Sequence, residues 1–118
     1  MTTEDFKQYG IHCPEKGIFI IILISKWCKS CKLLSIILEK IRDEGSIELR
    51  KIDIGEIGHL ARTLNIHAIP ALLFFKDGKL LNRDISIHGE SIVNKGILVG
   101  SFNEMILKEV IRQIKIEK

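Results

Sequence analysis

The chain has 118 residues, of which 46% are hydrophobic and 28% are charged, so it can form one globular domain, residues 1–118, with a single core. Its formal net charge of +3 is only mildly basic, and its basic residues are scattered among acidic ones, so nucleic acid is not expected as the main partner. Three cysteines cannot build a scaffold of several disulfides, which favours a reducing compartment over secretion.

The N-terminus and the longest apolar run argue against export and membrane insertion. The first five residues, Met1 to Asp5, lack the basic start of a signal peptide. The apolar run 18–24 is too short to cross a bilayer. We therefore expect a soluble protein in the cytoplasm, with no membrane partner.

The first predicted elements are a short helix and a buried strand. Thr3 has the position of an N-cap, and Gly10 follows the end of a helix predicted over residues 3–9. Residues 18–24, IFIIILI, form a continuous β-branched and aromatic run. Such a run is typical of a central parallel strand that is buried on both faces.

An amphipathic helix is predicted next, over residues 28–44. Its apolar residues recur at helical spacing, and Gly45 has the position of a C-terminal cap. A second strand is predicted over residues 47–54, and a second helix over residues 56–64. Asn65 is expected to close that helix in a left-handed conformation.

The C-terminal part predicts a hairpin and a last helix. A third strand is predicted over residues 71–75. The turn dipeptide Asp-Gly at 77–78 is expected to send the chain back antiparallel through residues 79–81. Ser101 and Glu104 have capping-box spacing ahead of a helical apolar pattern. The order helix, then β-α-β-α-β-β-α, predicts an α/β fold with crossover helices and a terminal antiparallel hairpin.

Two cysteines, Cys28 and Cys31, lie where the first predicted strand gives way to a helix. Near the first turn of a helix, free N–H groups and the helix dipole favour an anion, so a thiol there becomes a nucleophile. The same spacing is also half of a tetrahedral zinc site. Zinc is disfavoured because the histidines, at positions 12, 59, 67 and 88, do not have chelate spacing for the other half.

Two separated segments carry a resemblance to a known family. The run 27–32, WCKSCK, is similar to the W-C-G-P-C-K motif of the thioredoxin family, and the run 65–79, NIHAIPALLFFKDGK, resembles that family's segment around its cis-proline. With the surrounding elements, the resemblance covers nearly the whole chain. It implies a thioredoxin fold, which is a central mixed β-sheet flanked by helices, here with an extended C-terminal β-hairpin.

The resemblance also implies the chemistry of thiol-disulfide exchange. Cys28 is expected to attack a partner disulfide, and Cys31 to resolve the mixed disulfide. Lys29 adds a nearby cation that favours the Cys28 thiolate. The implied partners are disulfide-containing proteins and a thioredoxin reductase or similar electron donor. The chain is expected to be a monomer without a metal, flavin or nucleotide cofactor.

Substrate binding is implied at three further residues. The Ile69–Pro70 bond is expected to be cis and to stand across from the dithiol. Main-chain groups of Ile69 would then bind an extended substrate peptide, and Trp27 would supply an apolar wall. The alternative for Pro70 is an ordinary trans turn ahead of an edge strand.

The sequence departs from the family's pattern around the dithiol. Lys29 and Ser30 replace Gly-Pro between the cysteines, so the reduction potential cannot be carried over. Ile22 stands where the family has a buried aspartate that helps to deprotonate the resolving cysteine, so exchange should depend more steeply on pH. Lys51 matches the lysine that pairs with that aspartate. It is either a lone basic group below the dithiol or reaches water along its stem.

A further departure is an insertion over residues 79–98, which we interpret as an elongated hairpin or extra β-ribbon. It is either an extension of the sheet edge or a docking surface for a specific partner. Cys13 is most simply a small packing residue, with a regulatory or dimer-forming thiol as the alternative.

Two functions remain open on the sequence alone. One is a cytoplasmic oxidoreductase that reduces or exchanges disulfides of protein partners through the dithiol. The other is a binding or adaptor module that keeps the fold and has little general reductase activity. The missing acid at Ile22 keeps the second function open.

Overall fold

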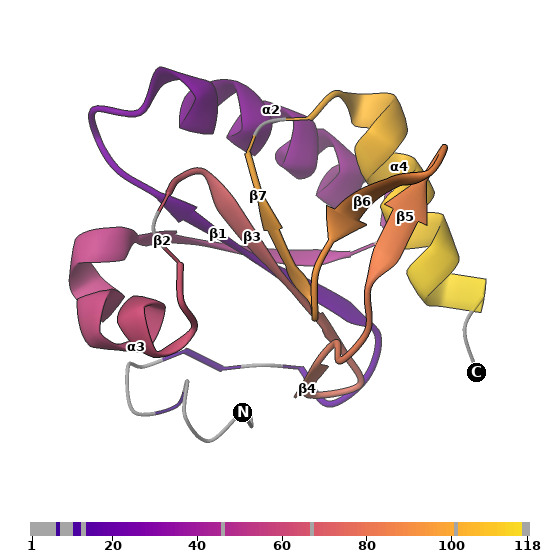
Figure 1. The fold of residues 1–118 in the computed structure, drawn as a ribbon, viewed down its shortest axis with the longest axis horizontal. Coiled ribbons are helices and arrows are strands. Elements are labelled where there is room, and N and C mark those ends of the chain that lie inside the picture. The colour runs from indigo at the N-terminus through magenta and orange to yellow at the C-terminus, as the bar shows by residue number, and fades with distance from the viewer. Residues whose placement is uncertain are drawn as a thin grey trace.

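The computed structural model describes residues 7, 11–12, 14–45, 47–66, 68–100 and 102–116. Within these residues the main sheet has five strands in the order β2-β1-β3-β4, with β7 also paired to β3 (Figure 1). The helix expected at residues 3–9 lies outside the described residues except at position 7, and Cys13 and Ser101, with the roles expected for them, lie outside as well.

The central strand is β1 (Ile18–Ile24), as its uniformly apolar sequence predicts. It pairs in parallel with β2 (Glu48–Asp53) and antiparallel with β3 (Ala71–Lys76). Successive side chains of a strand point to opposite faces of the sheet, so alternate residues of β1 enter two separate hydrophobic clusters. This arrangement explains why β1 shows no alternation of polar and apolar residues.

Helices cover both faces of the sheet (Figure 1). One cluster joins the sheet to α2 (Lys29–Asp43) and α4 (Glu104–Ile116), and the other joins it to the 3₁₀ turn η1 (Ile54–Ile57) and α3 (Gly58–Thr63). The fold is thus the predicted mixed sheet between helices.

Two helix starts differ from the prediction because short polar side chains cap them elsewhere. Asp53 accepts a hydrogen bond from the Gly55 N–H at 2.8 Å, and this cap starts the helical segment with η1, before residue 56. Asn103 caps α4 by accepting from the Ile106 N–H at 2.9 Å. α4 therefore begins at Glu104, later than a capping box that started at residue 101 would place it. Asn65 does have the predicted left-handed conformation, with φ 63°.

The edge of the sheet beside β3 is built from two separate pieces of chain. The predicted hairpin brings β4 (Lys79–Leu80) back along β3, and β7 (Ile97–Val99) continues along the same edge. Leu80 lies opposite Phe75, so an unbroken strand would bring residue 82 opposite Leu73, where Ile97 lies instead. Residues 82–96 are therefore extra.

The extra residues form the predicted ribbon, with β5 (Ile85–Ile87) paired antiparallel to β6 (Glu90–Val93). Four of its apolar side chains are buried in the same cluster as α4: Ile85, Ile87, Ile92 and Val93. The ribbon therefore extends the core beside α4.

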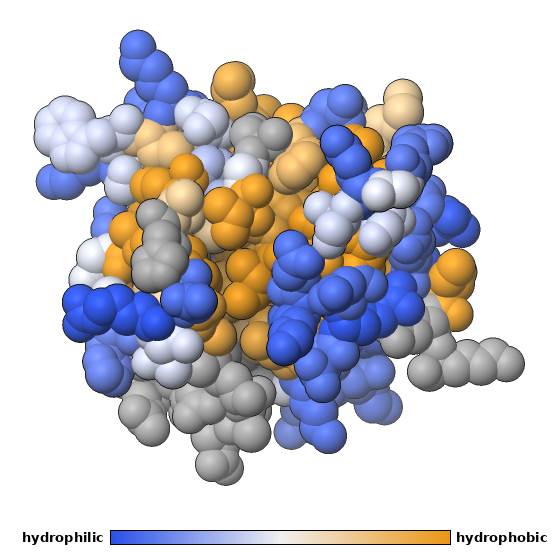
Figure 2. Space-filling view, in the orientation of Figure 1, coloured by the Kyte–Doolittle hydropathy of each residue, from blue (hydrophilic) through white to orange (hydrophobic). Residues whose placement is uncertain are grey.

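In the orientation of Figure 1, hydrophobic side chains gather over the middle of this face of the molecule and hydrophilic ones surround them (Figure 2).

The chain enters and leaves the insertion at Phe74, whose main-chain groups bind Gly96, the last inserted residue, and Leu81, the residue just before the insertion. The Phe74 N–H donates to the Gly96 carbonyl at 2.9 Å, and the Leu81 N–H donates to the Phe74 carbonyl at 2.8 Å. Gly96 has φ +83°, and a Cβ there would collide with the Leu81 carbonyl oxygen. A glycine is thus needed where the two pieces of the edge meet.

Candidate active site

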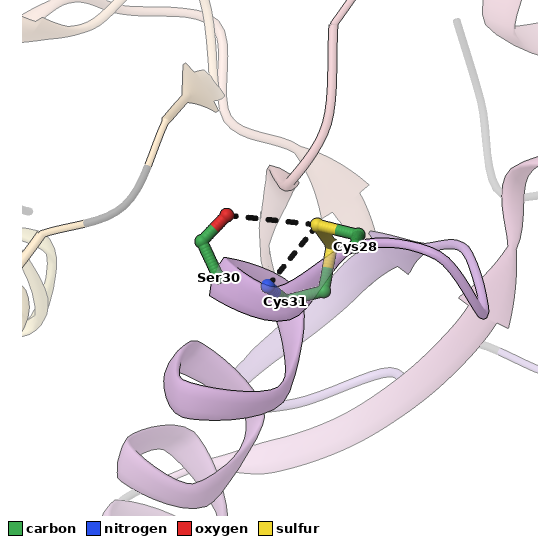
Figure 3. The surroundings of a disulfide bond; sticks show 3 residues. All are labelled: Cys28, Ser30 and Cys31. Carbon is green, nitrogen blue, oxygen red and sulfur yellow. Dashed lines mark hydrogen bonds between the residues drawn. A yellow bond between two sulfur atoms is a disulfide. The ribbon is translucent and has the colours of Figure 1, made fainter.

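The cysteine pair lies at the junction of β1 and α2. After β1 the chain turns, with the Cys28 N–H donating to the Ser25 carbonyl at 3.2 Å, and α2 begins at Lys29. Cys28 is the N-cap of α2: its backbone is extended, and its Sγ accepts a hydrogen bond from the Cys31 N–H at 3.1 Å (Figure 3). The helix predicted from residue 28 therefore starts one residue later, with the first cysteine as its cap.

The two sulfurs form a disulfide, with 5.2 Å between the Cα atoms, so the structure represents the oxidised state. Cys31 is 2% exposed, whereas Cys28 is only half-buried. The hydroxyl of Ser30 lies 3.6 Å from the Cys28 sulfur. Trp27, immediately before the pair, is 86% exposed. Cys28 is therefore the cysteine that a large partner can reach.

Pro70 lies at the same end of the sheet as the cysteine pair. The antiparallel register places Ala71, the first residue of β3, opposite Leu23 near the end of β1. The Ile69–Pro70 peptide bond just before it is cis, and the Pro70 carbonyl accepts from the Gly100 N–H at 2.9 Å. Pro70 is buried and Ile69 is half-buried.

An open hollow of about 490 Å³ lies beside Cys31. Its other lining residues come from the end of β1 and the turn after it, from α2 and from β2: Ile24, Ser25, Lys26, Lys32, Ser35, Ile36, Glu39, Lys51 and Asp53. The hollow thus brings charged groups of both signs close to the buried cysteine.

Lys51 has a partner that neither sequence interpretation included. Its Nζ lies 2.6 Å from Glu39 Oε1, and both side chains are partly exposed. The hydrogen bond from Lys51 lowers the pKa of Glu39. Lys51 is thus not a lone basic group, because its ammonium forms an ion pair with the carboxylate of Glu39 on α2.

Ile22 lies opposite Lys51 in the β1–β2 register and is completely buried. It belongs to the cluster between the sheet and α2. Hydrocarbon therefore fills the place where the resemblance would put a carboxylate.

Sequence reasoning missed Glu39 and Ser35. Cys31, Ser35 and Glu39 follow one another at intervals of four residues, which places them along one face of α2. That spacing was a usable signal for the wall of the hollow. The pairing of Glu39 with Lys51 was not readable, because it depends on how α2 packs against β2.

Neither metal ligands nor membrane spans emerge from the described part of the chain. Within it, no group of three or more histidine, cysteine, aspartate or glutamate side chains is placed to hold a metal ion. Its helices are each too short or too polar to span a bilayer.

Comparisons with known proteins converge on one family. A family model described as Thioredoxin matches residues 1–97. The chain is 36% identical over 86 residues to Thioredoxin C-2 of Corynebacterium nephridii, covering 71% of this chain and 79% of the relative. It is 32% identical over 72 residues to a thioredoxin of Chlamydia trachomatis, covering 60% and 71%.

Solved structures agree on the fold. A mutant thioredoxin from Halobacterium salinarum superposes with a TM-score of 0.65 at 22% identity, covering 83% of this chain and 74% of that one. Mitochondrial thioredoxin 3 from Saccharomyces cerevisiae, in its oxidised form, gives 0.63 at 21% identity, covering 94% and 88%. Because the family match includes both the cysteine pair and Pro70, the chain belongs to the thioredoxin family and is a thiol-disulfide oxidoreductase.

Proposed function

We propose that this chain reduces disulfides of protein partners, with Cys28 as the attacking nucleophile and Cys31 as the resolving thiol. The observation that carries the proposal is the N-cap geometry, in which the Cys28 sulfur accepts the Cys31 N–H at 3.1 Å. In the reduced protein the same N–H and the helix dipole would stabilise a Cys28 thiolate. The greater exposure of Cys28 supports the same assignment.

The exchange proceeds in two steps that transfer two electrons. The Cys28 thiolate attacks one sulfur of the partner disulfide, which forms a mixed disulfide and releases the partner's other sulfur as a thiolate that takes up a proton. Cys31 then loses its proton and attacks the Cys28 sulfur. That attack forms the Cys28–Cys31 disulfide and releases the second partner thiol, so the dithiol is oxidised and the partner is reduced.

The substrate segment is proposed to bind between Trp27 and the segment before β3. Trp27 is almost fully exposed next to Cys28 and offers an apolar surface. Ile69 and Pro70 lie at the same end of the sheet, and Ile69 main-chain groups would pair with an extended peptide. Lys29 and Lys51 are proposed to modulate the thiols, Lys29 as a cation beside Cys28 and Lys51 from the hollow next to Cys31.

The cycle requires an electron donor that returns two electrons to the disulfide. We propose a thioredoxin reductase in this role, with the chain acting as a cytoplasmic, monomeric, single-domain protein without a bound cofactor. The competing proposal is an adaptor that binds partners without turnover. It is favoured by Ile22, because hydrocarbon occupies the position from which a buried acid would take the Cys31 proton.

Insulin disulfide reduction tests the proposal, first with dithiothreitol and then with NADPH and a thioredoxin reductase. The native chain should turn over with both donors, and Cys28→Ser should abolish turnover. Cys31→Ser should trap mixed disulfides through Cys28, which mass spectrometry locates. Trapped species formed through Cys31 would reverse the roles, and no turnover with either donor would favour the adaptor.

A further inference from the structure

Three lysines surround the cysteine pair at intervals of three residues: Lys26, Lys29 and Lys32. All three are exposed, and none makes an ion pair with another described residue. The described lysines farther along the same helix and on β2 behave differently, since Lys40 pairs with Glu104 and Lys51 with Glu39. Within the described part of the chain, the cations beside the dithiol thus have no counterion.

Their position is unfavourable for the helix itself. The N-terminus of a helix carries partial positive charge, and acidic side chains are preferred there. The first turn of α2 has no acidic residue; Lys29 is its first residue, Lys32 follows one turn later, and Lys26 lies in the turn just before. Like charges gathered at this end repel one another and oppose the dipole. Stability of the chain therefore gives no reason for this arrangement.

The lysines also border the hollow beside the buried cysteine. Lys26 and Lys32 line it together with Cys31. Of the two carboxylates in its lining, Glu39 is bound by Lys51, and Asp53 accepts the Gly55 N–H at 2.8 Å. Asp53 keeps its charge, because a backbone N–H does not neutralise a carboxylate. With Lys26, Lys32 and Lys51 against Glu39 and Asp53, the lining still carries a net positive charge for a partner.

We propose that the three lysines select protein disulfides that are flanked by aspartate or glutamate. The proposal rests on the reductase function proposed above and adds the class of substrate. Carboxylates on both sides of the substrate cystine would supply counterions to Lys26, Lys29 and Lys32. The electron transfer is unchanged: the dithiol loses two electrons to the substrate disulfide, which leaves as two thiols.

Single-turnover reduction of designed peptides tests this substrate class. The chain is reduced with dithiothreitol, desalted, and mixed with cystine peptides of equal length that differ only in whether glutamate or glutamine flanks the cysteines. At low salt the acidic peptide should react about eightfold faster, from about twofold for each exposed lysine-carboxylate pair. The preference should nearly vanish at 1 M salt, where the screening length is about 3 Å.

A pair of double variants separates local from overall charge. Lys26→Gln with Lys32→Gln should reduce the preference to about twofold, because Lys29 alone remains. Lys16→Gln with Lys79→Gln removes the same charge at the opposite end of the sheet, where exposed Lys16 precedes β1 and exposed Lys79 begins β4, and it should leave the preference unchanged. The ratio of the two peptides is the readout, since any effect on the nucleophile itself enters both rates.

The outcomes distinguish the two proposals. Equal rates for both peptides, or an equal loss of preference in both double variants, would overturn the substrate class while leaving the reductase function intact. If neither peptide releases thiol, the reductase function fails and the substrate class fails with it.

Discussion

Replacing Ile22 by aspartate probes the main chemical departure of this site. Ile22 is fully buried in the cluster between the sheet and α2 and lies opposite Lys51 in the register, so an aspartate there has a lysine on the neighbouring strand. Loss of the buried side chain and burial of a polar group should cost about 3 to 5 kcal/mol. For a domain of this size, that loss lowers Tm by about 12 to 20 °C. Most small domains have about 5–15 kcal/mol of stability, so the variant should still fold.

The functional expectation concerns the pH dependence of the resolving step. In the native chain the rate should rise about tenfold per pH unit below the Cys31 pKa, because hydrocarbon stands where a buried base would take the proton. Ile22→Asp should raise the rate below pH 8 and flatten this slope. The assay is insulin reduction from pH 6 to 9, with Ile22→Asn as a control that has the same shape without a titrating group. A folded aspartate variant whose profile matches that of the asparagine variant would refute the reasoning.

Further predictions concern stability and can be checked by thermal or denaturant unfolding. Gly96→Ala should cost more than about 2 kcal/mol, since the positive φ costs about 1 to 2 kcal/mol and the collision adds to it. Gly89→Ala, with φ +82° and open space around it, should show the conformational cost alone, and equal losses would exclude the collision. Asn103→Ala should cost about 1 kcal/mol through loss of the α4 cap, and an unchanged midpoint would count against that cap. The hydrogen bond from Arg112 lowers the pKa of Glu109 to about 2. The stabilisation that the ionised Glu109 gains from Arg112 should therefore be complete above the ordinary glutamate pKa of 4.5 and lost as pH falls through about 2. The Tm difference between the native chain and Glu109→Gln should shrink over the same pH range and disappear below it.

Local patterns predicted the parts of the fold that local forces determine. The apolar run of β1 and the amphipathic period of α2 each follow from burial of nearby side chains. The start of η1 was missed because Asp53, at the end of a predicted strand, caps it with its side chain. A hydrogen bond of this kind depends on a single polar residue and leaves no periodic signal.

Tertiary pairings explain what could not be predicted. The insertion was recognisable from its length and its alternating isoleucines, but its burial against α4 depends on the position of β7 along β3. The partner of Lys51 likewise depends on α2 and β2 packing side by side, since Glu39 is 12 residues away in sequence. The motif residues were readable because Cys28 and Cys31 are fixed by the start of one helix.

The site places its electrostatic groups at the surface rather than beneath the sulfurs. Ile22 is buried hydrocarbon in the cluster between the sheet and α2, while Lys26, Lys29 and Lys32 are exposed beside the cysteine pair in the sequence. A buried acid is shielded from salt, whereas exposed charges are screened within about 10 Å at 0.1 M ionic strength. Reactivity in this chain should therefore respond to ionic strength and to the charge of the partner. A buried acid would instead provide a proton acceptor of fixed position. With isoleucine at residue 22 and exposed lysines beside the pair, control of exchange should lie more in the encounter with the substrate than in the interior.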